Sequence, residues 1–183
     1  MKTYISLLRS INVSGQNKIR MLELKGLYES LNLANVATYI QSGNVIFDCG
    51  EQDPVHLART IEAAIARTFD TSVRVLLREK NRFQQIIESN PFSGQRNKDP
   101  EKLHVTFLSD SPTESALNKL PVPTGIADEY MVYEKEVYLF CPNGYGRTKY
   151  SNSFFERKLS VATTTRNWKT VKAMYKIANQ RRL

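Results

Sequence analysis

The sequence lacks several features that would assign it to a class at once. It has no apolar run near the ~20 residues that span a bilayer, and the stretch Met1–Arg9 is interrupted too early for the core of a signal peptide. We expect a strand there and no membrane association. Cys49 and Cys141 lie far apart without CxxC spacing, which favours buried thiols in a reducing compartment over a disulfide framework. The expected location is therefore the cytoplasm.

Motifs of catalysis and metal binding are missing too. The two histidines, His56 and His104, do not form a cluster with ligand spacing, so we expect no metal site and no cofactor. The Walker A, GxGxxG, GxSxG and HExxH patterns do not occur, nor does a pair of catalytic carboxylates. No catalytic residue is assigned, and whether the chain is an enzyme stays open. His104 lies in a β-prone run, which favours a structural histidine.

The sequence does contain enough apolar residues for a core, and its charge is unevenly placed. Of 183 residues, 41% are hydrophobic and 24% charged, as in globular proteins. The net charge is +8, and residues 147–183 hold ten Lys or Arg with one acid, Glu156. That segment is +9, whereas the rest, with 16 basic and 17 acidic residues, is −1. Such asymmetry indicates an anionic partner, although a solvated basic helix that only aids solubility fits as well.

The first half of the chain has six segments with helix or strand periodicity. Strands are expected at 3–8, 36–40, 45–47 and 73–77, and helices at 21–31 and 54–69. Gln41-Ser42-Gly43-Asn44 has the composition of a hairpin turn. Asp53-Pro54 suits the start of the second helix, with Asp as cap and Pro in the first turn. The order β-α-β-β-α-β is that of ferredoxin-like folds.

The second half repeats this order after a connecting helix at 79–92 and a polar linker from Ser93 to Pro100. Strands are expected at 103–108, 129–133, 137–140 and 161–165, and helices at 112–120, 153–159 and 168–178. Ser111, Asn152 and either Thr165 or Asn167 are the expected helix caps. We therefore predict an α+β fold of two ferredoxin-like halves with antiparallel sheets, 1–90 and 91–183, plus a connecting helix and a C-terminal helix.

Two polar segments of the first half are candidates for function. The loop after the first strand holds Arg9, Asn12 and Lys18, and a loop that leaves a strand and opens a helix is a good anion site. A polar crossover loop explains the same residues without a ligand. In the hairpin, turn geometry explains Gly43 but does not require Gln41.

The basic C-terminal segment holds two more. Tyr145–Asn152 alternates glycines, bases and aromatics around Arg147 and Lys149, a mixture that suits phosphate contact with base stacking. On the last helix three lysines at i, i+3 and i+7 form one basic stripe, namely Lys169, Lys172 and Lys176. The lone Trp168 is expected to be a packing anchor.

Arg166 and Asn167 precede that helix. An arginine beside the positive end of a helix dipole is unfavourable unless an anion also binds there.

Three motifs, in their order and joint occurrence, resemble a known family. They are Leu7-Leu8-Arg9-Ser10-Ile11-Asn12-Val13, Thr38-Tyr39-Ile40-Gln41-Ser42-Gly43-Asn44-Val45-Ile46-Phe47, and Thr164-Thr165-Arg166-Asn167-Trp168 with Thr170-Val171. Over nearly the whole chain they are similar to the bacterial domain of unknown function 1697. The resemblance implies a bacterial cytosolic protein with a two-part α+β fold, and it brings no activity. The family usually has glycine at the positions of Ser10 and Ser14. If those glycines let a ligand approach the backbone closely, the serines of this chain are less suited to that role.

The resemblance also carries over a set of mostly polar residues. They are Arg9, Asn12, Gln41, Ser42, Gly43, Asn44, Asn152, Glu156, Thr165, Arg166, Asn167 and Trp168. Because loops distant in sequence can converge in a two-part fold, we hypothesise a common cleft. Its expected lining is Arg9, Gln41, Asn44, Arg166 and Asn167.

Three functions remain open, and the oligomeric state is not indicated. The first is binding of an anionic ligand, above all RNA or single-stranded DNA, by the basic C-terminal segment, although an RNP-like aromatic motif is missing. The second is an enzyme or sensor for a small phosphorylated or carboxylated ligand in an inter-domain cleft. The third is a structural or interaction module, in which Arg166 pairs with Glu156 or with buried carbonyls. The predicted ligand-binding residues are Arg9, Asn12, Lys18, Gln41, Asn44, Arg147, Lys149, Arg166, Asn167, Lys169, Lys172 and Lys176.

Overall fold

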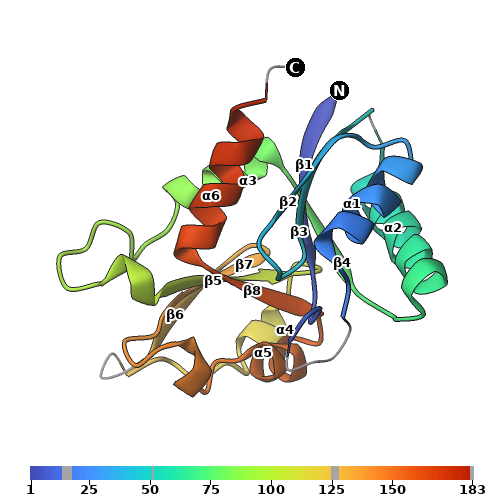
Figure 1. The fold of residues 1–183 in the computed structure, drawn as a ribbon. Coiled ribbons are helices and arrows are strands. Elements are labelled where there is room, and N and C mark those ends of the chain that lie inside the picture. Colours follow the sequence, from blue (N-terminus) through green and yellow to red (C-terminus); the bar gives the residue numbers. More distant parts are fainter. Residues whose placement is uncertain (14–17, 51, 125–127, 182–183) are drawn as a thin grey trace. The chain divides into compact units, whose positions relative to one another are not determined.

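The computed structural model describes residues 1–13, 18–50, 52–124 and 128–181. Along the chain, the order βαββαβ occurs twice, and one helix follows each occurrence (Figure 1). This confirms the predicted α+β fold of two ferredoxin-like halves with a connecting helix and a C-terminal helix. None of the helices in the described ranges is long and apolar enough to cross a membrane.

The first half forms one four-stranded antiparallel sheet. Its elements are β1 (Lys2–Leu8), α1 (Met21–Ser30), β2 (Ala34–Tyr39), β3 (Asn44–Cys49), α2 (Pro54–Phe69) and β4 (Val75–Glu79). The strand order is β2-β3-β1-β4, so the first strand lies in the middle of its sheet. Asp53 caps α2 as predicted, since its carboxylate accepts a hydrogen bond from His56 N at 2.9 Å.

The core of this half lies between the sheet and the helices α1 and α2, which cover one of its faces (Figure 1). The Tyr4 and Phe47 rings stack at 5.7 Å, and the Tyr28 ring meets Phe47 edge-on at 5.5 Å. The hydroxyls of Tyr28 and Ser6 lie 2.7 Å apart. Burial raises the pKa of Tyr28 far above its ordinary value, so this hydroxyl is a neutral hydrogen-bonding group.

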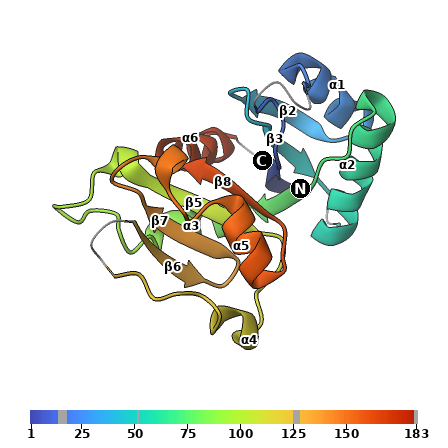
Figure 2. The same cartoon turned by 90° about the horizontal axis from the view of Figure 1, so that it is seen from below.

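The second half repeats the arrangement. Its elements are η1 (Pro100–Lys102), β5 (Leu103–Leu108), α4 (Glu114–Leu117), β6 (Glu129–Tyr133), β7 (Glu136–Phe140), η2 (Tyr145–Arg147), α5 (Asn152–Leu159) and β8 (Thr163–Asn167). The strand order is β6-β7-β5-β8, again antiparallel. The helices α4 and α5 cover one face around a core that includes Tyr150, Phe155 and Leu159 (Figure 2).

Two helices fall outside the repeats, α3 (Lys80–Glu88) and α6 (Trp168–Asn179). By contacts the chain divides into two compact units, Met1–Gln85 with Ala173–Leu183, and Ile86–Lys172. The end of the chain thus belongs with the first sheet, where Arg181 Nη2 donates to the Ile46 carbonyl at 3.0 Å. The predicted domains, 1–90 and 91–183, follow chain order and stay a prediction.

Several local predictions are wrong by a few residues. Thr113 and not Ser111 caps α4, and Ser151 and not Asn152 caps α5, each accepting from a backbone N–H three residues on at 3.3 Å. The strand expected at 161–165 is β8, Thr163–Asn167. In each case neighbouring residues suit the same role, and for β8 the pairing of Thr163 to Asn167 with β5 sets the bounds.

Candidate functional site

The first two family motifs include the loop after β1 and the turn between β2 and β3. This loop and this turn lie against each other at one end of the first sheet, and Asn12 joins them. Its Nδ2 group donates to the carbonyl oxygens of Ile19 at 2.9 Å and of Gln41 at 2.8 Å. Its Oδ1 accepts from Ile19 N at 2.9 Å. Both amide hydrogens of Asn12 are therefore used to hold the loop after β1 against the β2–β3 turn.

The turn between β2 and β3 is packed tightly against the end of β1. Leu8 N donates to the Gly43 carbonyl at 2.9 Å. Gly43 has a φ of +71°, and a Cβ there would lie 2.6 Å from Ile11 Cδ1 and 2.8 Å from Leu8 Cβ. Only glycine satisfies both the left-handed backbone and the close approach.

Three other residues of these loops have a left-handed backbone, Ser10 with a φ of 55°, Asn12 with 54° and Ile40 with 51°. Ile40 is the unusual one, because a β-branched residue rarely adopts this conformation. Its side chain is also 50% exposed. Strained backbone of this kind persists where the surrounding structure enforces it, here through the bonds to Gln41 and Gly43.

The predicted ligand-binding residues of these loops differ in accessibility. Lys18 and Gln41 are exposed, and Arg9 is half-buried with its backbone N–H donating to the Arg74 carbonyl at 2.9 Å. Asn44 is fully buried, and its Nδ2 donates to the Tyr39 carbonyl at 3.1 Å and to Ser42 Oγ at 2.9 Å. Of the exposed residues, Gln41 lies in the turn that Asn44 holds together, whereas Lys18 lies before α1.

In the second half, Arg166 lies within strand β8, whereas the sequence predicted that this strand ends at Thr165 and that Arg166 lies between it and the last helix. It lies in β8 opposite Val105, and only 7% of it is exposed. Its Nη1 donates to Thr164 Oγ1 at 2.7 Å and to the Thr165 carbonyl at 2.9 Å. Burial lowers the pKa of Arg166 to about 10, so the guanidinium stays charged at neutral pH.

Asn167 caps α6, so of the two predicted caps, Thr165 and Asn167, the second is confirmed. Its Oδ1 accepts from Lys169 N at 2.8 Å, and its Nδ2 donates to the Glu101 carbonyl at 3.2 Å. The side-chain amide therefore connects the start of α6 to the segment before β5.

A network of hydroxyls on the second sheet was not predicted from the sequence. Thr165 Oγ1 donates to Asn152 Oδ1 at 2.8 Å. The hydroxyl oxygens of Thr106 and Thr165 lie 2.7 Å apart. The Tyr145 hydroxyl also donates to Thr165, at 2.9 Å. Asn152 Oδ1 accepts from Thr163 Oγ1 as well, at 2.9 Å. The alternation of Thr163 and Thr165 along a strand is the sequence signal that places them on one face.

His104 and Glu156 extend this network. The His104 ring stacks on that of Tyr145 at 5.1 Å, and burial lowers the pKa of His104, partly offset by the bond from its Nδ1 to the Lys102 carbonyl. Burial raises the pKa of Tyr145, and the bond to Thr165 opposes the rise. Glu156 Oε1 accepts from Thr163 N at 2.9 Å. The lowered pKa of His104 and the raised pKa of Tyr145 leave both side chains neutral at neutral pH.

The cations of the basic C-terminal segment separate into buried and exposed ones. Within the described part of the segment, six are exposed, namely Arg147, Lys149, Arg157, Lys169, Lys172 and Lys176. Arg166 is buried and Arg181 is paired with Asp48. Lys149 Nζ lies 5.2 Å from the centre of the Tyr150 ring.

The lysine stripe of α6, which we define as Lys169, Lys172 and Lys176, lies on the exposed face of the helix. The opposite face is buried through Trp168, Val171, Met174 and Ala178. Trp168 is 2% exposed, as expected for a packing anchor. In the described ranges no three His, Cys, Asp or Glu side chains come close enough to hold a metal ion.

Comparison with known proteins adds a family and a fold. The model of the family "Protein of unknown function (DUF1697)" matches residues 1–138. A solved structure, the conserved bacterial protein SP0830 from Streptococcus pneumoniae, is similar with a TM-score of 0.71 and 23% identity, over 97% of this chain and 98% of that one. No match is found among curated proteins. Because the family model covers most of the sequence, including the first two motifs, the chain belongs to the DUF1697 family of proteins of unknown function.

Proposed function

We propose that the protein binds a polyanion, RNA or single-stranded DNA, through the basic C-terminal segment. The observation that carries the proposal is the lysine stripe of α6. Its three ammonium groups are exposed on one helix face, and none forms an ion pair with a carboxylate of the described residues. The stripe is thus available to an external anion.

The spacing of the stripe favours a chain of charges over a single one. With a rise of about 1.5 Å per residue, the Cα atoms of Lys169 and Lys172 lie about 4.5 Å apart along the axis, and those of Lys172 and Lys176 about 6 Å. A row of cations several ångströms apart matches successive phosphates better than one small anion. The half-buried Tyr175 ring lies on the same helix beside Lys172 and Lys176, where a base of a single strand can stack on it.

The test compares two triple variants by fluorescence anisotropy with labelled single-stranded RNA and DNA. The first replaces Lys169, Lys172 and Lys176 with alanine. The control replaces Arg67, Arg96 and Lys119, which are exposed elsewhere, so both variants lose three positive charges. At 0.1 M salt, three lost phosphate contacts weaken binding about 100-fold, since each releases about 0.7 counterion.

The control is expected to bind nearly as tightly as the unchanged protein. Equal weakening in both variants would mean that only net charge matters. Full binding by the stripe variant would overturn the proposal.

A further inference from the structure

The second sheet ends in an outer strand, β6, which has no further strand beside it among the residues that the structure describes (Figure 2). Its pairing with β7 runs without a bulge from Glu129 to Tyr133. Met131 and Tyr133 lie two positions apart, hence on one face of the sheet, and are 51% and 50% exposed. A regular, accessible and partly apolar edge is a template for pairing with another strand.

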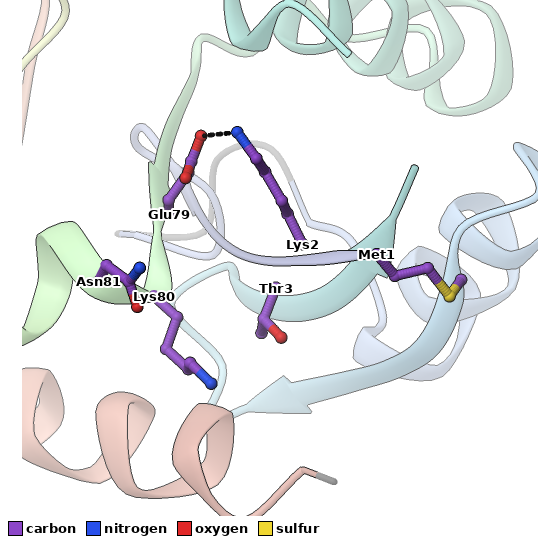
Figure 3. Close-up of a pocket in the computed structure, with 6 residues that line it drawn as sticks. All are labelled: Met1, Lys2, Thr3, Glu79, Lys80 and Asn81. Carbon is purple, nitrogen blue, oxygen red and sulfur yellow. Dashed lines mark hydrogen bonds and ion pairs between the residues drawn. The ribbon is translucent and has the colours of Figure 1, made fainter. Parts of the chain in front are cut away.

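The other outer strands are each protected against such pairing. In β2 the register shifts between Ala34 and Ala37, and Asn35 has a left-handed backbone, so the edge is irregular there. In β4 four of the five residues are buried, and the last one, Glu79, forms an ion pair with Lys2 at 3.1 Å (Figure 3). Most of β8 is buried as well. By contrast, β6 has neither a bulge nor a buried residue.

The hydrogen bonds of β7 determine which of its residues bond with β6. Leu108 N donates to the Lys135 carbonyl at 2.8 Å, and Cys141 N donates to the Lys102 carbonyl at 2.9 Å. Backbone groups alternate between the two neighbours of a strand, so the odd-numbered residues of β7 bond with β5. The even-numbered residues therefore bond with β6.

This alternation leaves a defined set of backbone groups on the outer side of β6. The partners of the even-numbered β7 residues are Glu129, Met131 and Tyr133. The N–H and C=O groups of Tyr130 and Val132 therefore point away from β7. Within the described ranges these four groups form no hydrogen bond, so two donors and two acceptors are available at the edge.

We propose that two copies of the chain pair through β6, antiparallel about a two-fold axis at Met131. The two second sheets, each of four strands, then become one continuous sheet. In this register Tyr130 lies opposite Val132 of the second copy, and Val132 opposite its Tyr130. All four outward groups of each copy are then bonded. Each edge supplies what the other needs, as in the isologous interfaces of two-fold dimers.

The side chains of this register fit a second copy. On the exposed face, Met131 lies opposite Met131 of the second copy, and Tyr133 lies opposite its Glu129. Glu129 already forms an ion pair with Lys98 of its own chain, so its charge is balanced before the strands meet. The contact is therefore mainly apolar and hydroxylic. Because it is only five residues long, the dimer is expected to be weak.

The ends of the strand give the dimer a salt dependence of definite sign. At both ends Asp128 faces Glu134 of the second copy, a like-charge contact that salt screens. Dimerisation should therefore strengthen as salt rises, whereas binding of a nucleic acid weakens. The pairing uses no residue of the lysine stripe of α6. It can fail while the proposed function stands, and the reverse also holds.

The first test is disulfide formation under mild oxidation in the full-length chain. In Met131→Cys the new thiols of two copies lie opposite each other, with Cα atoms about 4.5 Å apart, within reach of a disulfide. Tyr133→Cys is the matched control, because it is equally exposed on the same face but lies about 14 Å along the strand from its copy. The native Cys49 and Cys141 are buried. Covalent dimer should form in the first variant and not in the second, and equal yields in both would overturn the register.

The second test is sedimentation equilibrium of the unchanged protein at concentrations up to about 1 mM, where a weak dimer is populated. Met131→Lys places like charges opposite each other at the axis and should weaken association at least about fivefold. Leu22→Lys adds the same charge at a site in α1 that is 80% exposed and should leave association unchanged. A monomer throughout this range, or equal weakening by both lysine variants, would overturn the proposal.

Discussion

At the scale of single residues, the turn after β2 concentrates the unusual backbone of the molecule. Ile40 has a φ of 51° although it is β-branched, which costs roughly 1–2 kcal/mol. At most positions alanine is more stable than glycine, by about 0.4–1 kcal/mol. Here the order should be reversed. We expect Ile40→Gly to exceed Ile40→Ala by about 1 kcal/mol in the free energy of unfolding, measured with urea.

Gly43 should show the same preference for glycine over alanine, and more strongly. Gly43→Ala places a Cβ 2.6 Å from Ile11 Cδ1 on a backbone with a φ of +71°. Overpacking and strain together should cost about 2–4 kcal/mol in the free energy of unfolding. Gly26→Ala is the control, because nothing lies within 4 Å of its added Cβ, and in α1 it should stabilise by about 0.5–1 kcal/mol. Equal effects at the two glycines would contradict the packing described for the turn.

His104 predicts a pH dependence of stability. Burial holds its pKa below the ordinary value, which is about 6.5. The unfolded chain therefore binds this proton more readily, so the contribution of the neutral imidazole is complete above pH ~6.5 and is lost as the pH falls through the folded-state pKa. Urea unfolding between pH 7.5 and 5 should show this loss in the unchanged protein and a smaller one in His104→Gln. The same loss in both would rule out His104 as its source.

The sequence predicts single residues well where chemistry leaves one choice. Asp53 as a cap, Gly43 as a turn residue and Trp168 as an anchor follow from their neighbours. It does not reveal that Asn12 joins two loops, because its partner Gln41 lies 29 positions away. Nor does it show that the Asn44 amide bonds within its own turn, to Tyr39 and Ser42, since turn composition does not say which side chain closes the turn. The network around Thr165 is hidden because its partners Thr106, Tyr145 and Asn152 lie 59, 20 and 13 positions away.

At the scale of elements, the end of the chain is fastened to the first sheet by a buried ion pair. Arg181 Nη1 lies 3.6 Å from Asp48 Oδ1, and the carboxylate side chain is 1% exposed. Asp48 also accepts from Thr3 and Asn35, at 2.7 and 2.8 Å. Removing one partner of a buried pair leaves the other uncompensated.

We therefore expect Arg181→Ala to lower the free energy of unfolding by about 2–3 kcal/mol. Lys176→Ala, in the same segment but exposed, should change it by less than about 0.5 kcal/mol. In an Asp48→Asn background the arginine should matter less. A loss that is the same in both backgrounds would contradict the ion pair.

The order of elements could be predicted because helix and strand periodicities are strong in nearly every segment. Boundaries could be predicted less well. β8 shifts by two residues because Thr163, Thr165 and Arg166 pair with β5, which no local pattern contains. The sequence also does not show that the end of the chain belongs with the first sheet. That contact is made by Arg181 and Asp48, which lie 133 positions apart.

At the scale of the whole molecule, the structure divides the excess positive charge into two kinds. Arg166 is buried, and Arg181 forms an ion pair with the buried Asp48. Of the other cations in the segment, six that the structure describes are exposed. Composition alone locates the excess charge but cannot say which cations are used internally. The central claim, binding of a single-stranded nucleic acid, rests on the exposed set.

The most direct measurement is the affinity of the unchanged protein for labelled single-stranded RNA and DNA across a salt series. The three lysines of the stripe alone should give a slope of log K against log salt of about −2, at roughly 0.7 per contact. The other exposed cations should make it steeper. The stripe variant should then flatten the slope by about 2 units. Absence of binding at low salt, or a slope that the stripe variant leaves unchanged, would contradict the account.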